Sequence, residues 1–372
     1  MKDFKIITFY LPQFHTIPEN DEWWGAGFTE WTNVKKAEPL FEGHYQPRIP
    51  LNYNYYDLSD AENMKWQVDI AKKYGIYGFC FYHYWFSEKP LLEKPLLNFL
   101  EHKKINIPFC LCWANESWTN AWAKPDNTIL IEQTYGDKDE WERHFNFLLP
   151  FLKDERYIVE DNKPLIVIYR PYLCDRMIDM LNYWQVLARN NGFDGLKVAS
   201  QRFENPSKHQ ELFNYLDYHI EYQPNRCFEE INKQSFLMKR LVSLQDYILK
   251  KFNIDLSFRK KKGKLIKYNF DVLWEIILKE KPISDKAIAG AFVDFDNTPR
   301  YKYRGRIVVG SSPEKFKTYL YKQFKHIEEE YNNNYLFVFA WNEWGEGGYL
   351  EPDEKNKFGY LEAIKESLEY NK

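Results

Sequence analysis

The chain of 372 residues lacks long apolar runs and a strong charge of either sign. No stretch of about 18 or more apolar residues occurs, so we expect no membrane span. Residues Met1–Thr8 carry two lysines but no sustained apolar run before Pro12, which argues against a signal peptide. The net charge of -3 argues against a general nucleic-acid binder, because such proteins are usually basic. We therefore expect a cytoplasmic protein with no nucleic-acid partner.

Residues with the spacing of a metal site or a catalytic nucleophile are also missing. The five cysteines are odd in number and are typical of reduced packing residues in a cytosolic protein. His15, His44 and His83 are scattered, and the chain has no G-x-S-x-G elbow and no Walker-type glycine loop. Asp294-Phe295-Asp296 matches D-x-D by its letters alone. We therefore expect neither a metal nor a cofactor.

Aromatic residues, in contrast, are abundant and reach 19% of the chain. Many tryptophans stand among polar residues, where a ring offers a flat apolar face and a polar edge. Sugars present flat C–H faces ringed by hydroxyls, so such a surface suits them, although most rings are expected in the core. These tryptophans are Trp23, Trp24, Trp31, Trp113, Trp118, Trp122, Trp341 and Trp344.

Strand-like apolar runs alternate with helical patterns along the chain. Eight runs with helical crossovers favour a closed barrel of parallel strands. The runs are Lys5–Leu11, Ile76–Tyr82, Ile107–Trp113, Pro164–Tyr169, Leu196–Ser200, Tyr218–Tyr222, Ala287–Val293 and Tyr335–Trp341. We predict the α/β class and one (β/α)8 (TIM) barrel over residues 1–372. A long aperiodic loop, about His15 to Asp57, follows the first strand, and a helical insertion, residues 225–285, separates the sixth and seventh.

The residues that close these runs are unusually polar. In a (β/α)8 barrel the active site lies at the C-terminal ends of the strands, so these side chains are expected to converge. The strongest local feature is Asn342-Glu343-Trp344-Gly345-Glu346, directly after the last run. Glycoside cleavage needs one protonated and one ionised carboxyl group. A Trp neighbour can raise one pKa by desolvation, and the glycines permit a tight turn. A Glu pair that caps the final helix is the structural alternative.

Six motifs extend this pattern along the chain. They are Phe9-Tyr10-Leu11-Pro12-Gln13-Phe14-His15, Glu22-Trp23-Trp24-Gly25, Gly27-Phe28-Thr29-Glu30-Trp31-Thr32-Asn33, residues 75–86 (GIYGFCFYHYWF), Trp113-Ala114-Asn115-Glu116, and Ala340-Trp341-Asn342-Glu343-Trp344-Gly345-Glu346-Gly347. They resemble the WbsX-type glycosyltransferase family, which carries a domain similar to glycoside hydrolase family 99, the endo-α-mannosidase barrels. The resemblance covers nearly the whole chain except residues 225–285. It implies a (β/α)8 barrel that acts in O-antigen, lipopolysaccharide, capsular or related surface-polysaccharide metabolism.

The resemblance also implies roles for the two glutamates. Family 99 hydrolases act with retention through a 1,2-anhydro sugar, with two glutamates three apart after the final strand. By that pattern Glu343 is the base for the sugar 2-OH, and Glu346 is the acid/base for the leaving group and the acceptor. Trp344-Gly345-Glu346 departs from the Trp-His-Glu common in the hydrolases, which puts their exact specificity in doubt.

Strand ends and motifs together give the expected site. Glu343 and Glu346 are the expected catalytic residues, and the substrate is expected to be an oligosaccharide or glycolipid. We expect at least two of the strand-end tryptophans Trp31, Trp85, Trp113 and Trp344 to line the cleft. The expected substrate-binding residues are His15, Glu30, Trp31, His83, Tyr84, Trp85, Trp113, Asn115, Glu116, Trp118, Arg170, Tyr222, Asp294, Asn342 and Trp344.

Several alternatives stay open. The sequence does not decide between hydrolysis and transfer. A non-catalytic glycan-binding barrel would use the aromatic rim without chemistry, and a glycosyltransferase could use an activated sugar donor by a different mechanism. Within the expected insertion, Arg259, Lys260, Lys261 and Lys262 form the strongest charge run. This run is either a solvated segment or a contact with an anionic membrane.

Overall fold

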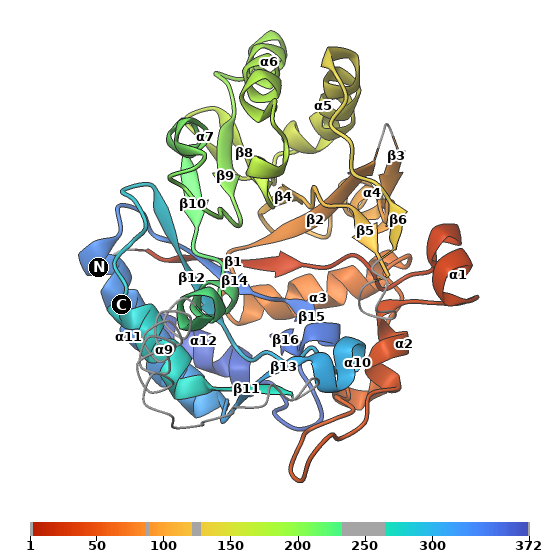
Figure 1. Cartoon of the computed structure of the whole chain (residues 1–372), viewed down its shortest axis with the longest axis vertical. Helices are drawn as coiled ribbons and strands as arrows, with labels where there is room; N and C mark the ends of the chain where they lie inside the picture. Colours follow the sequence, from red (N-terminus) through yellow and green to blue (C-terminus); the bar gives the residue numbers. More distant parts are fainter. Residues whose placement is uncertain (1–2, 87–88, 121–127, 233–264, 371–372) are drawn as a thin grey trace, which may run out of the picture.

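The computed structural model describes residues 3–86, 89–120, 128–232 and 265–370. Within these residues, eight parallel strands close into a barrel (Figure 1). They pair in the order β1-β14-β12-β10-β9-β8-β4-β2, and β2 pairs with β1 to complete the circle. The strands are β1 (Lys5–Tyr10), β2 (Gly78–Phe86), β4 (Phe109–Trp113), β8 (Lys163–Ile168), β9 (Lys197–Ser200), β10 (Tyr218–Ile220), β12 (Ala287–Phe292) and β14 (Tyr335–Phe339). The predicted barrel is confirmed.

The helices between the strands begin where the sequence supplies capping residues. Asp60, Asp137 and Ser312 each accept a backbone N–H in the first turn of the helix that follows. The final helix begins at Gly359 and not near Asp353, because Asp353 holds a turn through Asn356 N–H and bonds Tyr349 O–H. The larger helices are α3 (Ala61–Lys73), α4 (Lys94–Glu101), α5 (Lys138–Leu152), α6 (Met177–Asn190), α9 (Phe270–Lys279), α11 (Pro313–Glu330) and α12 (Gly359–Tyr370).

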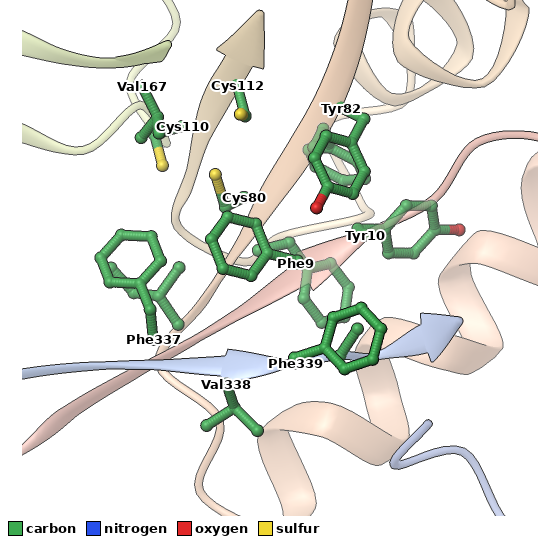
Figure 2. Close-up of a cluster of buried hydrophobic side chains, with 14 of the residues drawn as sticks. Phe9, Tyr10, Cys80, Tyr82, Cys110, Cys112, Val167, Phe337, Val338 and Phe339 are labelled. Atoms are coloured by element: carbon green, nitrogen blue, oxygen red, sulfur yellow. The ribbon is translucent and has the colours of Figure 1, made fainter. Parts of the chain in front are cut away.

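The barrel interior is filled by rings and thiols. Phe9 of β1 stacks on Tyr82 of β2 at 5.7 Å between centroids, and packs on Phe337 of β14 at 5.4 Å. Figure 2 shows these rings beside the sulfur atoms of Cys80, Cys110 and Cys112. All five cysteines of the chain are buried free thiols, as expected of packing residues. No helix in the described part of the chain combines the length and the apolar character needed to cross a membrane.

The segment after β1 is not the structureless loop that the sequence predicted. It contains α1 (Pro18–Trp24), α2 (Glu30–Lys35) and a single 3-10 turn, Leu51–Tyr53. These helices are too short to produce a visible hydrophobic period, which is the physical reason for the error. Their start signals were present, with Pro18 in the first turn of α1 and a capping box between Thr29 and Thr32 at α2. In Figure 1, α1 and α2 lie at the end of the barrel to which β1 points.

The segment between β10 and β12 is described only in part. Residues 225–232 are helical, β11 (Ile266–Asn269) pairs with β13 (Arg306–Val309), and α9 follows β11. Trp274 of α9 stacks on Phe292 of β12 and Tyr319 of α11, each at 5.6 Å. This helix therefore covers the barrel wall as the other helices do. The boundaries of the insertion stay a prediction, and the basic run Arg259–Lys262 lies outside the described residues.

Candidate active site

A cavity of about 460 Å³ opens at the C-terminal ends of the barrel strands. Side chains from the segments that end or follow all eight strands contribute to its lining, and α1, α2 and the short helix α10 (Thr298–Tyr301) supply further walls. This is the rim where barrels of this type carry their active sites. The lining includes Trp23, Trp24, Glu30, Tyr82, Tyr84, Glu116, Trp118, Tyr169, Arg202, Tyr222, Asn297, Arg300, Tyr301, Arg306, Glu343 and Glu346.

A hairpin after β14 carries the two glutamates into this cavity. Strand β15 (Asn342–Glu343) pairs with β16 (Gly348–Tyr349), and a 3-10 turn over Trp344–Glu346 joins them. Gly347 closes the turn with a φ of 64°, a left-handed conformation that glycine adopts without steric cost. Both Glu343 and Glu346 line the cavity. The tight turn therefore brings carboxylates three residues apart to one wall.

Glu343 is buried without a compensating cation of its own. Its exposed fraction is 6%, and its Oε2 has no hydrogen-bond partner among the described residues. Burial raises the pKa of Glu343 well above its usual value, the charge of Glu346 raises it further, and Arg300 opposes both. Such a carboxylate is a stronger proton acceptor than a solvated one.

Glu346, in contrast, has a cationic partner. Arg300 Nη1 donates to its Oε1 at 3.1 Å, and Arg300 also binds Glu30 through Nε at 3.1 Å and Nη2 at 2.9 Å. Burial raises the pKa of Glu346, and Arg300 counteracts part of that rise. The two glutamates therefore occupy different environments: one is desolvated and unpartnered, and the other is ion-paired.

Gly345 makes this arrangement possible. A Cβ atom at this position would lie 2.0 Å from Glu30 Oε1 and 3.1 Å from Arg300 Nε. Neither atom can easily withdraw, because Glu30 is 3% exposed and held on both oxygens by Arg300. A side chain at 345 would therefore displace the ion pair next to Glu346.

Seven of the predicted site residues meet at the cavity. Trp118 lies edge-on to Trp23 of α1, at 5.8 Å, and to Tyr84, at 5.1 Å, so the aromatic wall comes from three segments. Glu116 forms an ion pair with Arg170, and its pKa is raised by burial although Arg170 opposes the rise. The seven are Glu30, Tyr84, Glu116, Trp118, Tyr222, Glu343 and Glu346.

Three predicted site residues point away from the cavity, toward α5. His83 Nε2 lies 2.9 Å from His144 Nε2, Trp85 stacks on the His144 ring at 4.7 Å, and Trp113 meets it edge-on at 4.8 Å. Successive side chains of a strand alternate between its faces, so Tyr82 and Tyr84 face inward while His83 and Trp85 face outward. Trp113 is in register with His83 and shares its face. Burial lowers the pKa of His83 to about 3, which keeps its ring neutral.

Trp31, Trp344 and Asn342 support the hairpin and do not line the cavity. The Trp31 indole donates to Tyr56 O at 2.8 Å, and Trp344 stacks on Tyr349 at 3.7 Å. The Asn342 amide accepts from Leu11 N–H at 2.7 Å and donates to its carbonyl at 3.0 Å, which ties the hairpin to the end of β1. None of Trp31, Trp85, Trp113 and Trp344 lines the cavity, contrary to the expectation that at least two would.

The remaining predicted residues brace the loops of the rim. His15 bonds the carbonyl of Pro12 at 3.0 Å, and the Asn115 amide holds the backbone of Arg170 at 2.8 and 2.9 Å. Asp294 binds Arg48 at 2.8 Å.

Both carboxylates of the Asp294-Phe295-Asp296 segment thus accept hydrogen bonds from side chains of the protein itself. Asp296 accepts from His44 at 2.8 Å, Gln46 at 2.7 Å and Thr298 Oγ1 at 2.6 Å. Within the described ranges, no group of three or more His, Cys, Asp and Glu residues is arranged to hold a metal.

Three cationic residues of the cavity, Arg202, Arg300 and Arg306, were missed from the sequence. Arg202 lies two residues after the end of β9, as Arg170 does after β8, so the strand-end rule that gave Arg170 could have found it. Arg300 lies in α10, several residues beyond β12, in a segment without a recognisable motif. Only its ion pairs with Glu30 and Glu346, two residues that are far apart in the sequence, identify Arg300 as part of the site.

Solved structures show the same fold. The family 99 endo-α-mannosidase from Bacteroides thetaiotaomicron, in complex with Bis-Tris propane, aligns with a TM-score of 0.56 at 13% identity, over 100% of this chain and 98% of that one. A glycoside hydrolase-like protein aligns with a TM-score of 0.56 at 11% identity, over 99% and 94%. At such low identity the likeness shows the barrel.

Sequence relatives and a family model define the relationship further. Two strains of Xanthomonas campestris pv. campestris carry a protein named uncharacterized protein WxcX, 34% identical over 371 residues and 33% identical over 370 residues. Each alignment covers 98% of this chain and 49% of the relative, so the chain spans about half the length of the curated relatives it matches. The family model described as glycosyltransferase WbsX matches residues 6–364. The chain therefore belongs to the WbsX glycosyltransferase family, a class of carbohydrate-active enzyme built here on a (β/α)8 barrel.

Proposed function

We propose that this chain cleaves or transfers glycosidic bonds of an oligosaccharide or glycolipid, with retention of anomeric configuration, in surface-polysaccharide metabolism of the O-antigen or lipopolysaccharide type. One observation carries the proposal. Glu343 and Glu346 reach the same cavity wall from one hairpin, and only Glu346 is paired with a cation. Family membership and the fold shared with an endo-α-mannosidase support it.

The proposed reaction uses the sugar's own 2-hydroxyl. Glu343 takes the 2-OH proton while O2 attacks C1, and the bond from C1 to the leaving oxygen breaks as Glu346 gives that oxygen a proton. In the second step Glu346 takes a proton from water or a sugar acceptor, whose oxygen attacks C1. The C1–O2 bond breaks, and Glu343 returns its proton to O2. Two inversions at C1 give retention. The Oε2 atom of Glu343, which has no hydrogen-bond partner among the described residues and lies at the cavity, supports its role as the base.

The aromatic wall supports a sugar as the substrate. Trp23, Trp24 and Trp118 line the cavity beside the carboxylates. Their rings provide flat apolar surfaces on which pyranose C–H faces can stack. The neighbouring polar groups of Glu30, Asn297 and Tyr301 offer partners to sugar hydroxyls.

A panel of glycosyl fluorides with O2 and fluoride on opposite faces, such as α-mannosyl fluoride, tests the proposal. Fluoride leaves without a proton, so Glu346→Gln should keep more activity on fluorides than on a sugar leaving group. Glu343→Gln should lose about 10²–10⁴-fold on both. A 2-deoxy donor should be inert, because it lacks the attacking oxygen.

The control for these variants is Glu354→Gln, which changes a carboxylate paired with Lys357 outside the cavity. Product anomers read by NMR should show retention. Turnover of the 2-deoxy donor, or full activity in both glutamate variants, would contradict the mechanism. Unchanged sugar binding without any turnover in the wild type would favour the non-catalytic glycan-binding alternative.

The proposed setting is cytoplasmic and biosynthetic. The five buried free thiols support a reducing compartment. Contact with an anionic membrane through Arg259, Lys260, Lys261 and Lys262 remains part of this proposal. Neutralising the four residues should abolish salt-dependent binding to phosphatidylserine vesicles. Absence of such binding in the unmodified protein would leave the run as a solvated segment.

A further inference from the structure

The three arginines that line the cavity differ in their partners. Arg202 is paired with Glu204 at 3.1 Å and Glu229 at 2.6 Å, and Arg300 is paired with Glu30 and Glu346. Arg306 is different: among the described residues no carboxylate lies within 4 Å of its guanidinium, which instead lies over the Phe228 ring at 5.7 Å. Within the part of the chain that the structure describes, one cationic group of the cavity is therefore left without a carboxylate partner.

The backbone around Arg306 fixes it to the wall that carries Glu346. Arg306 N–H donates to Asn297 Oδ1 at 2.7 Å, and its carbonyl accepts from Asn297 N–H at 3.2 Å. Asp296, which precedes Asn297 in the chain, donates its N–H to the carbonyl of Glu346 at 2.6 Å. Two hydrogen-bonded steps therefore connect Arg306 to the proposed acid/base, and strand β13 continues from Arg306 into its pairing with β11.

The chemistry of a guanidinium in this position favours an oxyanion. Arginine is charged at every accessible pH, and its planar fork matches two oxygens of a phosphate or carboxylate. A half-buried guanidinium has lost part of its water, which is unfavourable unless an anion replaces it. Asn225, Asn297 and Tyr301 line the same cavity and add neutral hydrogen-bonding groups.

We propose that Arg306 forms an anionic subsite that binds a phosphate or carboxylate group on the sugar unit at the leaving-group and acceptor side of the cavity. The assignment of that side rests on the proposed function, in which Glu346 serves the leaving group and the acceptor. The substrate or acceptor is accordingly a sugar phosphate or a uronate, and neutral sugars bind there more weakly.

Direct binding tests the subsite without any need for turnover. Isothermal titration of the whole chain would compare mannose 1-phosphate, methyl glucuronide and neutral methyl mannoside at low and high salt. We expect the wild type to bind at least one anionic probe about tenfold more tightly than the neutral sugar, with the preference weakened by salt. The phosphate and carboxylate probes identify the source of the oxyanion.

Variants then assign the effect to Arg306. Arg306→Gln should remove the preference for the anionic probe and leave binding of the neutral sugar unchanged, and Arg306→Lys should keep part of it. Arg176→Gln, which removes an equal charge paired with Asp179 outside the cavity, should behave as wild type. No anion preference in the wild type, or an unchanged preference in Arg306→Gln, would overturn the proposal. The result is independent of the glycosyl fluoride test, so either proposal can fail alone.

Discussion

Two buried carboxylate clusters lie within nine residues of each other along the chain, and they differ in what surrounds them. Glu343 and Glu346 face the cavity, and Glu343 Oε2 has no hydrogen-bond partner in the described part of the chain. Glu351, just beyond the hairpin, is 3% exposed and does not line the cavity. It accepts hydrogen bonds from Tyr56 O–H at 2.8 Å, Gln67 Nε2 at 2.6 Å and Trp344 Nε1 at 2.6 Å.

Burial raises the pKa of the carboxyl groups in both clusters, and it raises that of Glu351 to about 7. A raised pKa alone therefore does not distinguish a reacting group from a structural one. The difference lies in unfilled hydrogen-bonding capacity and in access to a cavity. Glu351 has donors on both oxygens and holds the hairpin from behind, whereas Glu343 keeps an oxygen free beside the space for a substrate.

Replacing one glutamate from each cluster gives the largest expected contrast. Glu343→Gln should lower turnover by about 10²–10⁴-fold with little change in melting temperature, because it removes an ionisable group and keeps the shape. Glu351→Gln should change turnover by less than about tenfold and lower the free energy of unfolding by about 1–3 kcal/mol, because it places an amide donor among three donors. Glycosyl fluoride kinetics and thermal denaturation would measure both. The reverse ranking would break the distinction between the clusters.

Trp344 and Trp118 allow a similar comparison between a residue that supports the fold and a residue that lines the cavity. Trp344 is 1% exposed and bonds Glu351, so Trp344→Ala should lower the free energy of unfolding by about 3–5 kcal/mol. Trp118 lines the cavity, so Trp118→Ala should weaken saccharide affinity by roughly 1–3 kcal/mol and affect stability less. Parallel titrations and melting curves would check this. A stability loss for Trp118→Ala as large as that for Trp344→Ala, with unchanged affinity, would end the aromatic-wall interpretation.

The cluster around Glu351 should also make the stability of the protein depend on pH. The folded pKa of Glu351 is about 7, above the usual value of 4.5, so the folded state binds its proton more tightly than the unfolded state. Its contribution is fully present below about pH 4.5 and is lost as pH rises through about 7, a change of about 3 kcal/mol. Denaturant titrations between pH 5 and 8 should show this loss in the wild type and a flatter profile in Glu351→Gln. Equal slopes in the two proteins would contradict it.

The cluster of Glu343 and Glu346 should instead show its charge interaction with Arg300 in the pH–rate profile. Arg300 lowers the pKa of both Glu343 and Glu346, so Arg300→Gln should move both limbs of a bell-shaped profile to higher pH, by about one unit. Arg300→Lys keeps the charge and should shift the limbs less. A profile that falls in height without moving would mean that Arg300 only supports the fold.

The sequence by itself determined the barrel and the place of the two glutamates. Eight apolar runs separated by helical patterns leave a closed parallel sheet as the arrangement that buries every run. Polar residues that follow such strands must meet at one rim, and Glu343 and Glu346 follow the last strand closely enough for that rule to place them.

Only the tertiary structure decided which side chains of the rim face the cavity. Alternation along β2 separates His83 and Trp85 from Tyr82 and Tyr84, but packing against His144 of α5 determines which pair turns outward. Arg300 and Glu30 are 270 positions apart and meet only when α10 and α2 fold over the hairpin. The physical reason is that strand periodicity is a local property of the chain. Long-range ion pairs and the burial of one particular face depend on contacts that only the folded chain makes.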